Sequence, residues 1–403
     1  MSIKQLEEIS AFIQREVDEK HIPGAIAAVY KDGKQVFQTG RGMADMEKGQ
    51  RIAEDTIFRM YSMTKPITAA AAMLFAERGQ LRLEDPVSRY LPEFSEMKVL
   101  DKARVIPAIR EIKIMDLLNM TSGIVYPDPD PAGRKMEEYF DKVHLAIREG
   151  RAYTTREVMG FIASCPLAFQ PGTGWRYGLS ADVLAAVLEV IDSRKISEIY
   201  KEDIFDPLDM KDTGFYVPKE KQHRFAQLYR QKYQYDEEKK IKASSLEIDF
   251  KRHLGLTDCL QPPGYESGGA GICSTLRDYS RFAQMLAGGG ALDGIRILDR
   301  STVETFTQNQ LKDVRLLTVN FPQLNGYGYS SLMRTRLIDG EPDDFGVAGE
   351  FGWDGWTGPY FTVDLKDNFT FIYLVQISGY SNIPLMKKLR NIAYTALDWK
   401  QDV

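Results

Sequence analysis

The sequence predicts an α+β fold, in which an antiparallel sheet is flanked by helices from both ends of the chain and carries an inserted, mostly helical domain. Two observations predict this arrangement. Both ends of the 403-residue chain combine a helical pattern with a β-hairpin pattern. The middle of the chain instead alternates helical patterns with long loops rich in proline and glycine. A chain of this length buries a large core, as one large or two closely packed domains.

The N-terminal end supplies the first helix and the first hairpin. Residues 1–20 mix charged with apolar residues, and the apolar ones recur at helical spacing: Ile3, Leu6, Ile9, Ile13 and Val17. The stretch GAIAAVYKDGKQVFQTGRG follows, with a β-rich run on either side of Asp32-Gly33. Because this dipeptide favours tight hairpin turns, residues 24–42 are predicted to form two paired strands.

The C-terminal end has the same elements in the opposite order. The stretch YFTVDLKDNFTFIYLVQIS predicts a second hairpin that turns at residues 366–368. A last helix follows, and its apolar face holds Leu385, Leu389, Ile392 and Ala396. Hairpins form antiparallel sheets, and a helix can cover one face of such a sheet. We therefore expect both terminal helices to cover the sheet.

Helical patterns occupy the middle of the chain, around residues 66–78, 135–149, 180–192 and 275–287. Long loops such as YPDPDPAGR and CLQPPGYESGGAG separate them. We therefore expect a discontinuous sheet domain made of residues 1–85 and 287–403, with a mostly helical domain inserted at residues 86–286. A cleft between the two is the expected place for an active site.

Composition narrows the possible partners. The net charge is −5, and lysines and arginines are scattered among acids, so no nucleic-acid surface is predicted. No segment is apolar over the length of a membrane span, and the N-terminus lacks the apolar core of a signal peptide, so we expect a cytoplasmic protein. Cys165, Cys259 and Cys273 have no metal-ligand spacing and are expected to be free thiols. We expect no metal and no cofactor, and the sequence does not indicate an oligomeric state.

Two Ser-x-x-Lys sequences raise the question of a serine nucleophile with a lysine base. They are SMTK at residues 62–65 and SEMK at residues 95–98. Because chance alone gives about one such spacing in this composition, only context can separate them. Ser62 precedes PITAAAAMLFAERG, a run of strong helix formers, whereas Ser95 lies in a charged stretch interrupted by proline. We expect the second copy to be a solvated loop.

The first copy has the local features of an activated serine. Pro66 costs little in the first turn of a helix, so Ser62 is predicted at the helix N-terminus. Residues three apart share a helix face, which brings the Lys65 amine within reach of the Ser62 hydroxyl. The helix dipole favours an oxyanion there, and apolar neighbours would lower the pKa of Lys65 toward that of a base. On these residues alone, Ser62 as a helix cap and Lys65 as an exposed side chain remain an open alternative.

Five stretches in order extend this site across roughly three hundred residues. They are FRMYSMTKPIT at 58–68, LLNMTSGI at 117–124, PGTGWRYGLSADVL at 171–184, GGAGICSTLRDYSRFAQML at 268–286 and FGWDGWTGPYFTVD at 351–364. With them the chain resembles the serine β-lactamase and penicillin-binding-protein superfamily, on the class C-like branch that includes the family VIII carboxylesterases. The resemblance implies a β-lactamase/transpeptidase-like fold, which agrees with the architecture predicted above.

The resemblance also implies three catalytic residues. In the family, the serine of the first motif is acylated and its lysine takes part in proton transfer. A Tyr-x-Asn motif supplies a tyrosine that shares the work of the general base. Ser62, Lys65 and Tyr177 match these positions. Such a division is chemically sensible, because a serine hydroxyl must lose its proton as it attacks.

A third motif is implied on the strand that faces the serine. Trp353-Asp354-Gly355 is the best match to the Lys-Thr-Gly of the β-lactamases and resembles the tryptophan-containing version of family VIII esterases. By position, the backbone amides of Ser62 and Trp356 would form the oxyanion hole. A carboxylate at Asp354 would disfavour charge in that hole, so we expect its side chain to point into solvent or to pair with an arginine.

Two departures from the family pattern bear on the substrate. Trp353 replaces a lysine that would hold the carboxylate of a penicillin, and Leu179 replaces the asparagine of Tyr-x-Asn. Both changes make the site more apolar, which favours esters and other neutral acyl groups over β-lactams and peptides. Tyr126 is a further candidate for the acyl pocket, although it could equally belong to the core.

Three hypotheses for the function follow. The first is a serine carboxylesterase or acyltransferase that forms an acyl-enzyme on Ser62 with a small ester or amide substrate. The second is a β-lactamase or a peptidase for D-amino-acid or peptidoglycan-like substrates. The third is a non-catalytic acyl-binding or sensor module. A Ser-His-Asp hydrolase is not indicated, because no Gly-x-Ser-x-Gly occurs.

Overall fold

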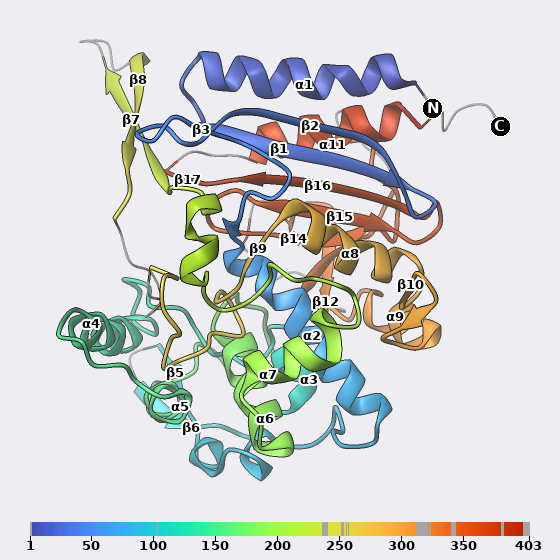
Figure 1. Ribbon diagram of the computed structural model, residues 1–403. Helices are drawn as coiled ribbons and strands as arrows, with labels where there is room; N and C mark the ends of the chain where they lie inside the picture. Colours follow the sequence, from blue (N-terminus) through green and yellow to red (C-terminus); the bar gives the residue numbers. More distant parts are fainter. Residues whose placement is uncertain are drawn as a thin grey trace.

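An eight-stranded antiparallel sheet forms the centre of the structure (Figure 1). The structure is a computed structural model that describes residues 2–397 apart from 103, 236–240, 251–253, 255, 257, 312–320, 322–323, 340–343 and 380–382. The strand order is β12-β13-β14-β15-β16-β1-β2-β3. The bounds are β1 (Gly24–Lys31), β2 (Lys34–Asp45), β3 (Gln50–Arg51), β12 (Tyr327–Ser330), β13 (Met333–Arg336), β14 (Phe351–Asp354), β15 (Tyr360–Asp364) and β16 (Phe369–Val375).

The two ends of the chain meet in the middle of this sheet. β1 pairs with β16 in antiparallel register from Ala25 opposite Val375 to Lys31 opposite Phe369. β1 also pairs with β2, and β15 with β16, so the two predicted hairpins are both present. The predicted α+β arrangement, with an antiparallel sheet built from both ends of the chain, is confirmed.

The two terminal helices cover one face of the sheet. α1 (Ile3–Asp18) and α11 (Ile383–Thr395) lie side by side above the strands in Figure 1. Because side chains alternate across a strand, β1 directs every second residue toward them. The apolar layer between these helices and the sheet contains Leu6, Ile9, Ile13, Ala25, Ala27, Val29, Leu385 and Leu389. The expectation that both terminal helices pack on the sheet is therefore correct.

The opposite face of the sheet is covered by α2 (Thr64–Glu77) and α8 (Leu276–Ala287). The other residues of β1, Ile26 and Ala28, point into this layer. α2 is buried continuously from Thr64 to Phe75, which explains its run of alanines and the absence of a polar face. α8 contacts β1, β15 and β16. The buried helix α2 thus places its first turn deep inside the molecule.

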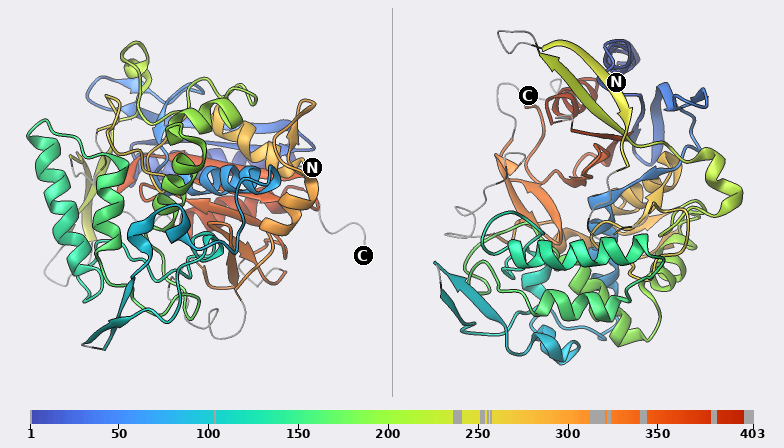
Figure 2. Two further views of the ribbon diagram at one scale, coloured as in Figure 1. Left: turned by 90° about the horizontal axis from the view of Figure 1, so that it is seen from below. Right: turned by 90° about the vertical axis from the view of Figure 1, so that its left-hand side faces the viewer.

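The remaining helices lie on the α2 side of the sheet, away from the terminal helices, as Figure 1 and Figure 2 show. The α-helices are α3 (Ile114–Leu118), α4 (Arg134–Arg148), α5 (Thr155–Ala163), α6 (Ser180–Asp192), α7 (Ile196–Tyr200) and α9 (Arg300–Phe306). Short 3-10 or π turns are η1 (Tyr61–Met63), η2 (Val87–Arg89), η3 (Pro92–Phe94), η4 (Lys201–Phe205) and η5 (Lys219–Arg224). The division of the chain at residues 86 and 287 stays a prediction.

Four further small sheets lie outside the central sheet among the described residues. They are β4 (Phe58–Arg59) with β9 (Cys273–Ser274), β5 (Lys98–Asp101) with β6 (Arg104–Pro107), β10 (Ala291–Leu292) with β11 (Ile295–Arg296), and β17 (Ile377–Ser378) with β7 (Tyr229–Tyr235) and β8 (Ile241–Ile248). The β4–β9 pair matters most for function, because it fixes residues 58–60 beside residues 272–274 just before Ser62. In the described part of the chain, no helix is both long and apolar enough to cross a membrane.

Candidate active site

Ser62 lies in a 3-10 turn that leads directly into the buried helix α2. The turn covers Tyr61–Met63, and α2 begins at Thr64 with Pro66 in its first turn. The helix therefore starts two residues later than the position predicted for Ser62, and Met63 is the capping residue, without a side-chain capping bond. The structural alternative, in which Ser62 caps the helix, is thus not what the structure shows. The Ser62 hydroxyl is left to other partners.

The residue before the candidate nucleophile has an unusual backbone. Tyr61 has φ +44°, in the left-handed region that an aromatic residue rarely adopts. Such a conformation costs on the order of 1–3 kcal/mol and persists only where the surroundings fix it. Here the ring of Tyr61 is buried and packs edge-on against Trp356, with 5.4 Å between ring centroids. The surrounding contacts thus hold the strained turn that presents Ser62.

Lys65 is fully buried, and its amine has three polar neighbours. Its Nζ lies 3.2 Å from Ser62 Oγ, 2.8 Å from the Tyr126 hydroxyl and 2.8 Å from the Gly269 carbonyl oxygen. A neutral amine has two N–H donors and one lone pair. The Gly269 carbonyl can only accept, and the Tyr126 hydroxyl is able to accept, so the lone pair is free to face the Ser62 hydroxyl. The geometry therefore suits an amine that takes the proton of Ser62.

Burial adjusts the acidity of this amine to the neutral range. Removal from water disfavours the charged form and lowers the pKa of Lys65 to about 7. The carboxylates of Asp182 and Asp354 act in the opposite direction, but burial is the larger effect. A lysine with a pKa near the working pH is half neutral and can act as a general base. The prediction of a desolvated Lys65 within reach of Ser62 agrees with this geometry.

Tyr177 lies against the same amine. Its ring centroid is 4.7 Å from Lys65 Nζ, and its hydroxyl accepts a 2.9 Å hydrogen bond from Trp353 Nε1. Burial raises the pKa of Tyr177, although hydrogen bonds with Ser62 and Trp353 oppose the rise. Burial likewise raises the pKa of Tyr126 well above its usual value. Both tyrosines are therefore neutral phenols at neutral pH, and Lys65 is the group of the three that titrates there.

Aromatic rings surround the Tyr177 side of the site. Tyr177 contacts the rings of four residues: Tyr126, Trp175, Phe321 and Trp353. Tyr329 completes the group through edge-on contacts with Trp175 and Trp353. The indole of Trp353 is itself buried, with 1% exposed. The polar atom of Trp353 thus serves Tyr177, and a contact between Trp353 and the substrate stays a prediction.

The end of β14 approaches the nucleophile turn closely. A side chain at Gly355 would bring a Cβ within 2.5 Å of the Met60 carbonyl oxygen, so glycine is required there. The next residue, Trp356, packs on Tyr61. These two contacts place the backbone of residues 355–356 beside the turn that contains Ser62. The arrangement is compatible with the expected oxyanion hole, in which the Ser62 and Trp356 amides point at one oxygen.

Asp354 pairs with an arginine, which is one of the two outcomes expected for it. Arg334 Nη1 donates to Asp354 Oδ1 at 3.0 Å, and Arg334 Nη2 donates to the Phe361 carbonyl oxygen at 3.1 Å. Burial raises the pKa of Asp354, whereas Arg334 and Lys65 lower it. The carboxylate is thus held at the edge of the site by a buried guanidinium.

The other predicted positions separate into two groups. Tyr126 contacts Lys65 directly, and its place in the acyl pocket stays a prediction. Leu179 is a buried core residue that precedes α6, and no described contact brings its side chain to Ser62. The second Ser-x-x-Lys copy is on the surface, because Ser95 and Lys98 are both exposed. The prediction of a solvated second copy is therefore confirmed.

Two residues of the site were missed from the sequence. Gly269 offers the carbonyl that accepts from Lys65, and Asp182 donates no bond but accepts one from the Gly269 amide at 3.2 Å. Gly269 carries no local signal, because its role depends on a contact with residue 65. Asp182 did carry one: it is a charged residue within the apolar helical run SADVLAAVLEVID. A buried carboxylate on such a helix requires a polar partner.

Metal ligands are not part of this arrangement. Within the described residues, the only group of side chains that could hold a metal ion is Glu16, Glu19 and His21, at the end of α1. This group belongs to the layer of terminal helices on the other face of the sheet from α2. Beside Ser62 the structure places the Lys65 amine and the phenols of Tyr126 and Tyr177.

Comparisons with known proteins match almost the whole length of the chain. A model of the beta-lactamase family matches residues 9–391. Protein Rv1367c of Mycobacterium tuberculosis is 31% identical over 376 residues, which cover 91% of this chain and 88% of that protein. Esterase EstB of Burkholderia gladioli is 30% identical over 399 residues, which cover 96% and 94%. The solved structure of EstCE1, described as a hydrolase with promiscuous acyltransferase activity, matches with a TM-score of 0.79 at 24% identity, covering 98% of this chain and 100% of that one.

Proposed function

The chain belongs to the beta-lactamase family, and from this premise we propose that it is a serine carboxylesterase that forms an acyl-enzyme on Ser62. The observation that carries the proposal is the buried amine of Lys65, which lies 3.2 Å from Ser62 Oγ and has a pKa lowered to about 7 by burial. A surface lysine would be charged and could not accept a proton. Lys65 is neutral in about half of the molecules at pH 7.

Acylation begins with the proton of Ser62. As Ser62 Oγ attacks the ester carbonyl carbon, its proton passes to the lone pair of Lys65. The carbonyl oxygen becomes an oxyanion, which the backbone amides of Ser62 and Trp356 stabilise. The proton then passes through the Tyr177 phenol to the leaving alcohol; this role is supported by the position of the phenol, whose ring lies against Lys65 and whose hydroxyl forms a hydrogen bond with Ser62. The C–O bond breaks, and an ester of Ser62 remains.

Deacylation repeats these steps with a second nucleophile. Water gives its proton to Lys65 and attacks the acyl group, and Ser62 Oγ leaves with a proton returned through the same phenol. An alcohol in place of water would make the enzyme an acyltransferase. EstCE1, which shares this fold, is described as a hydrolase with promiscuous acyltransferase activity, so both acceptors are tested below.

The surroundings of the site favour neutral acyl groups. Trp353 supplies an uncharged N–H in the position where β-lactamases carry a lysine, so no cation from this motif is available for a substrate carboxylate. Asp354 adds a negative charge at the same strand end. The buried Arg334 guanidinium is already paired with Asp354, so a substrate carboxylate placed there would compete with that ion pair. The proposed substrates are therefore small neutral esters, and the relative EstB is named an esterase.

The test is hydrolysis of a short-chain p-nitrophenyl ester and of a chromogenic cephalosporin by the wild type, Ser62→Ala and the matched control Ser95→Ala. We expect ester turnover that disappears in Ser62→Ala and is retained in Ser95→Ala, with little cephalosporin turnover. Addition of a primary alcohol to the ester assay shows whether transfer competes with hydrolysis.

Two other results would change the assignment. Efficient cephalosporin turnover that depends on Ser62 would replace the esterase with a β-lactamase on the same nucleophile. No turnover of either compound, with no covalent adduct on Ser62 by intact mass, would reject the acyl-enzyme and favour a binding module.

A further inference from the structure

A buried carboxylate, that of Asp182, is linked to the Lys65 amine through a single residue, Gly269. Asp182, in the first turn of α6, is 1% exposed. Its Oδ1 accepts hydrogen bonds from the Tyr265 hydroxyl at 2.5 Å, the Ser267 hydroxyl at 2.5 Å and the Gly269 amide at 3.2 Å. Its Oδ2 is buried and has no hydrogen-bond partner among the described residues. A charged group in this position is expensive, which calls for an explanation beyond packing.

The carboxylate and the amine hold opposite sides of the same residue. The Gly269 amide donates to Asp182, while the Gly269 carbonyl accepts from Lys65 at 2.8 Å. The contact is so close that a Cβ on Gly269 would lie 2.4 Å from Asp182 Oδ2. Glycine is thus the residue that allows the backbone to reach the carboxylate. Any movement of Asp182 would move the carbonyl that holds Lys65.

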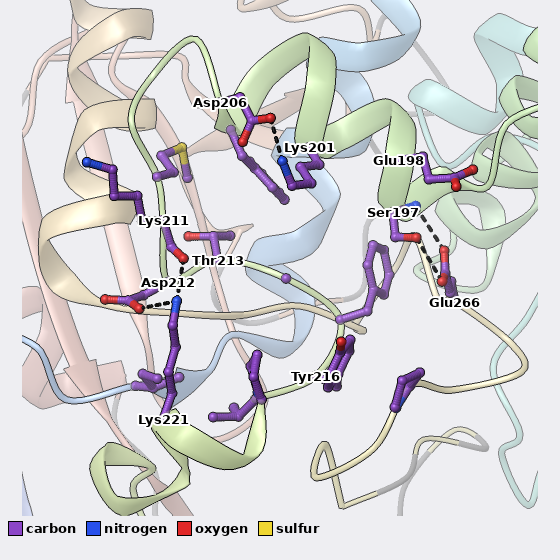
Figure 3. Close-up of a pocket in the computed structure, with 18 residues that line it drawn as sticks. Ser197, Glu198, Lys201, Asp206, Lys211, Asp212, Thr213, Tyr216, Lys221 and Glu266 are labelled. Atoms are coloured by element: carbon purple, nitrogen blue, oxygen red, sulfur yellow. Dashed lines mark hydrogen bonds and ion pairs between the residues drawn. The ribbon is translucent and has the colours of Figure 1, made fainter.

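The segment is also fixed at its other end. The Glu266 carboxylate accepts hydrogen bonds from the Ser197 amide and the Ser197 hydroxyl, both at 2.9 Å (Figure 3). These residues line a cavity of about 320 Å³ that does not include Ser62, Lys65 or Tyr177. Near Gly269, the Thr68 hydroxyl donates to the Gly268 carbonyl oxygen. Residues 265–269 are therefore held by hydrogen bonds to α2, α6 and α7. Asp182 on α6 accepts three of these bonds.

The charge of Asp182 acts on Lys65 as well. Of the charged groups around the amine, Asp182 is the one that most raises the pKa of Lys65 against the effect of burial. The titratable and charged groups that face the amine are Asp182 on α6, Asp354 on β14 with its partner Arg334 on β13, and the phenols of Tyr126 and Tyr177. Asp354 has an arginine partner, whereas Asp182 is bound by uncharged donors only.

We propose that Asp182 is a positioning residue for Lys65: it holds the Gly269 carbonyl against the amine and places a buried carboxylate on the other side of that glycine. The proposal rests on the proposed function of Lys65. It assigns to α6 a direct part in the chemistry of α2, through one glycine.

The experiment measures phosphonylation of Ser62 by a p-nitrophenyl phosphonate ester, followed by intact mass from pH 5 to pH 9. In this reaction Ser62 Oγ forms a bond to phosphorus, p-nitrophenolate leaves, and the Ser62 proton goes to Lys65. The variants are Asp182→Asn and Ser267→Ala. The second variant removes one hydrogen bond to the same carboxylate but keeps its charge, so it controls for loss of packing.

Asp182→Asn should slow phosphonylation at high pH by about tenfold, because the Gly269 carbonyl is held less firmly. It should also move the pH midpoint of the reaction down by about one unit, since a negative charge that favours protonated Lys65 is gone. Ser267→Ala should lower the rate without moving the midpoint. An unchanged midpoint in Asp182→Asn, or an equal shift in Ser267→Ala, would overturn the proposal.

Two further results keep the proposal distinct from the esterase assignment. If Asp182→Asn does not fold by circular dichroism, Gly269→Ala tests the positioning role, and a wild-type rate in that variant would refute it. If the wild type hydrolyses no ester but phosphonylation shows the expected shift, the esterase fails and the inference stands. If the wild type is not phosphonylated at any pH, both fail.

Discussion

The chain contains two serine–lysine pairs of identical spacing in opposite surroundings. Ser62 and Lys65 lie at the start of a buried helix, and the Lys65 amine is fully enclosed with three polar neighbours. Ser95 follows a short 3-10 turn, Lys98 begins strand β5, and both are exposed. The spacing thus allows the serine and the lysine to come into contact. Burial then lowers the pKa of the lysine, which allows it to act as a base.

The difference between the pairs comes from the residues that follow them. Behind Ser62 stands α2, whose residues from Thr64 to Phe75 are all buried, so Lys65 enters the interior with its helix. Behind Ser95 stands the two-stranded pair β5–β6, which leaves Lys98 in water. Whether a Ser-x-x-Lys motif can be catalytic therefore depends on the apolar run that follows it, because that run decides whether the lysine is buried.

The largest expected difference between the pairs is in catalysis. Lys65→Met removes the proton acceptor while keeping the length of the side chain, and we expect kcat/KM for a p-nitrophenyl ester to fall by about 10³-fold. The matched variant Lys98→Met should change kcat/KM by less than about twofold. Thermal unfolding of both variants checks that the fold is retained. Similar losses in the two variants would show that burial does not distinguish the two lysines in catalysis.

The pH dependence of activity tests whether the buried Lys65 is the base. Because burial lowers the pKa of Lys65 to about 7, the amine is charged below pH 7 and cannot accept the Ser62 proton. We expect kcat/KM to be level above about pH 8 and to fall about tenfold per pH unit below 7, a loss of about 100-fold at pH 5. A steady-state profile from pH 5 to 9 measures this. A profile that is flat across pH 7 would assign the base to another group.

The same group links pH to stability, which provides a check without substrate. The pKa of Lys65 is lower in the folded than in the unfolded chain, so between about pH 7 and 10 the unfolded state binds more protons. The free energy of unfolding therefore rises with pH in this window, by on the order of 4 kcal/mol from this group. Denaturant unfolding of the wild type and Lys65→Met should show the rise only in the wild type. Equal slopes would contradict a neutral buried amine.

A smaller effect separates the two tryptophans near the site. Trp353→Phe removes the N–H that donates a hydrogen bond to the Tyr177 hydroxyl. We expect kcat to fall about fivefold to tenfold, in line with the loss of one buried hydrogen bond. Trp356 is 39% exposed, and Trp356→Phe keeps an aromatic ring beside Tyr61, so its effect should stay below about twofold. Steady-state kinetics of both variants measures this. The reverse order would mean that Tyr177 does not depend on Trp353.

The smallest effect concerns substrate charge. Asp354→Asn removes a carboxylate and leaves the Arg334 guanidinium without its ion pair at the edge of the site. We expect kcat/KM for an ester with a terminal carboxylate to rise about threefold to tenfold relative to an uncharged ester of equal length. The ratio, rather than either value alone, is the measurement. An unchanged ratio would show that Asp354 does not act on the acyl group.

Sequence patterns predicted the sheet well, because its signals are local. The Asp32-Gly33 turn and the turn at residues 366–368 each mark a hairpin, and both hairpins are present in the structure. Ser62 and Lys65 were also found locally, from a helix that follows them. Tyr177 needed the resemblance to a family, because nothing near it in the sequence points to residue 65.

The parts that could not be predicted depend on contacts between distant residues. The Gly269 carbonyl reaches Lys65 across 204 positions of sequence, and the Trp353 indole reaches Tyr177 across 176. The place of Trp353 in the third motif was predicted, but the direction of its indole toward Tyr177 was not. Asp182 was overlooked because a charged residue in a helical run is usually solvent-exposed. Each case requires the register of two elements, which a single sequence does not contain.

The pairing of β1 with β16 has a consequence for the newly made chain. These strands are more than three hundred residues apart, and each is the other's neighbour at the centre of the sheet. A ribosome releases Ser62 and Lys65 early, but β14 and the middle of the sheet are completed only after residue 375 has emerged. For most of its synthesis the growing polypeptide therefore contains Ser62 without the completed sheet. A chain that stops before β16 would lack a central strand of the sheet, and we expect it to be inactive rather than weakly active.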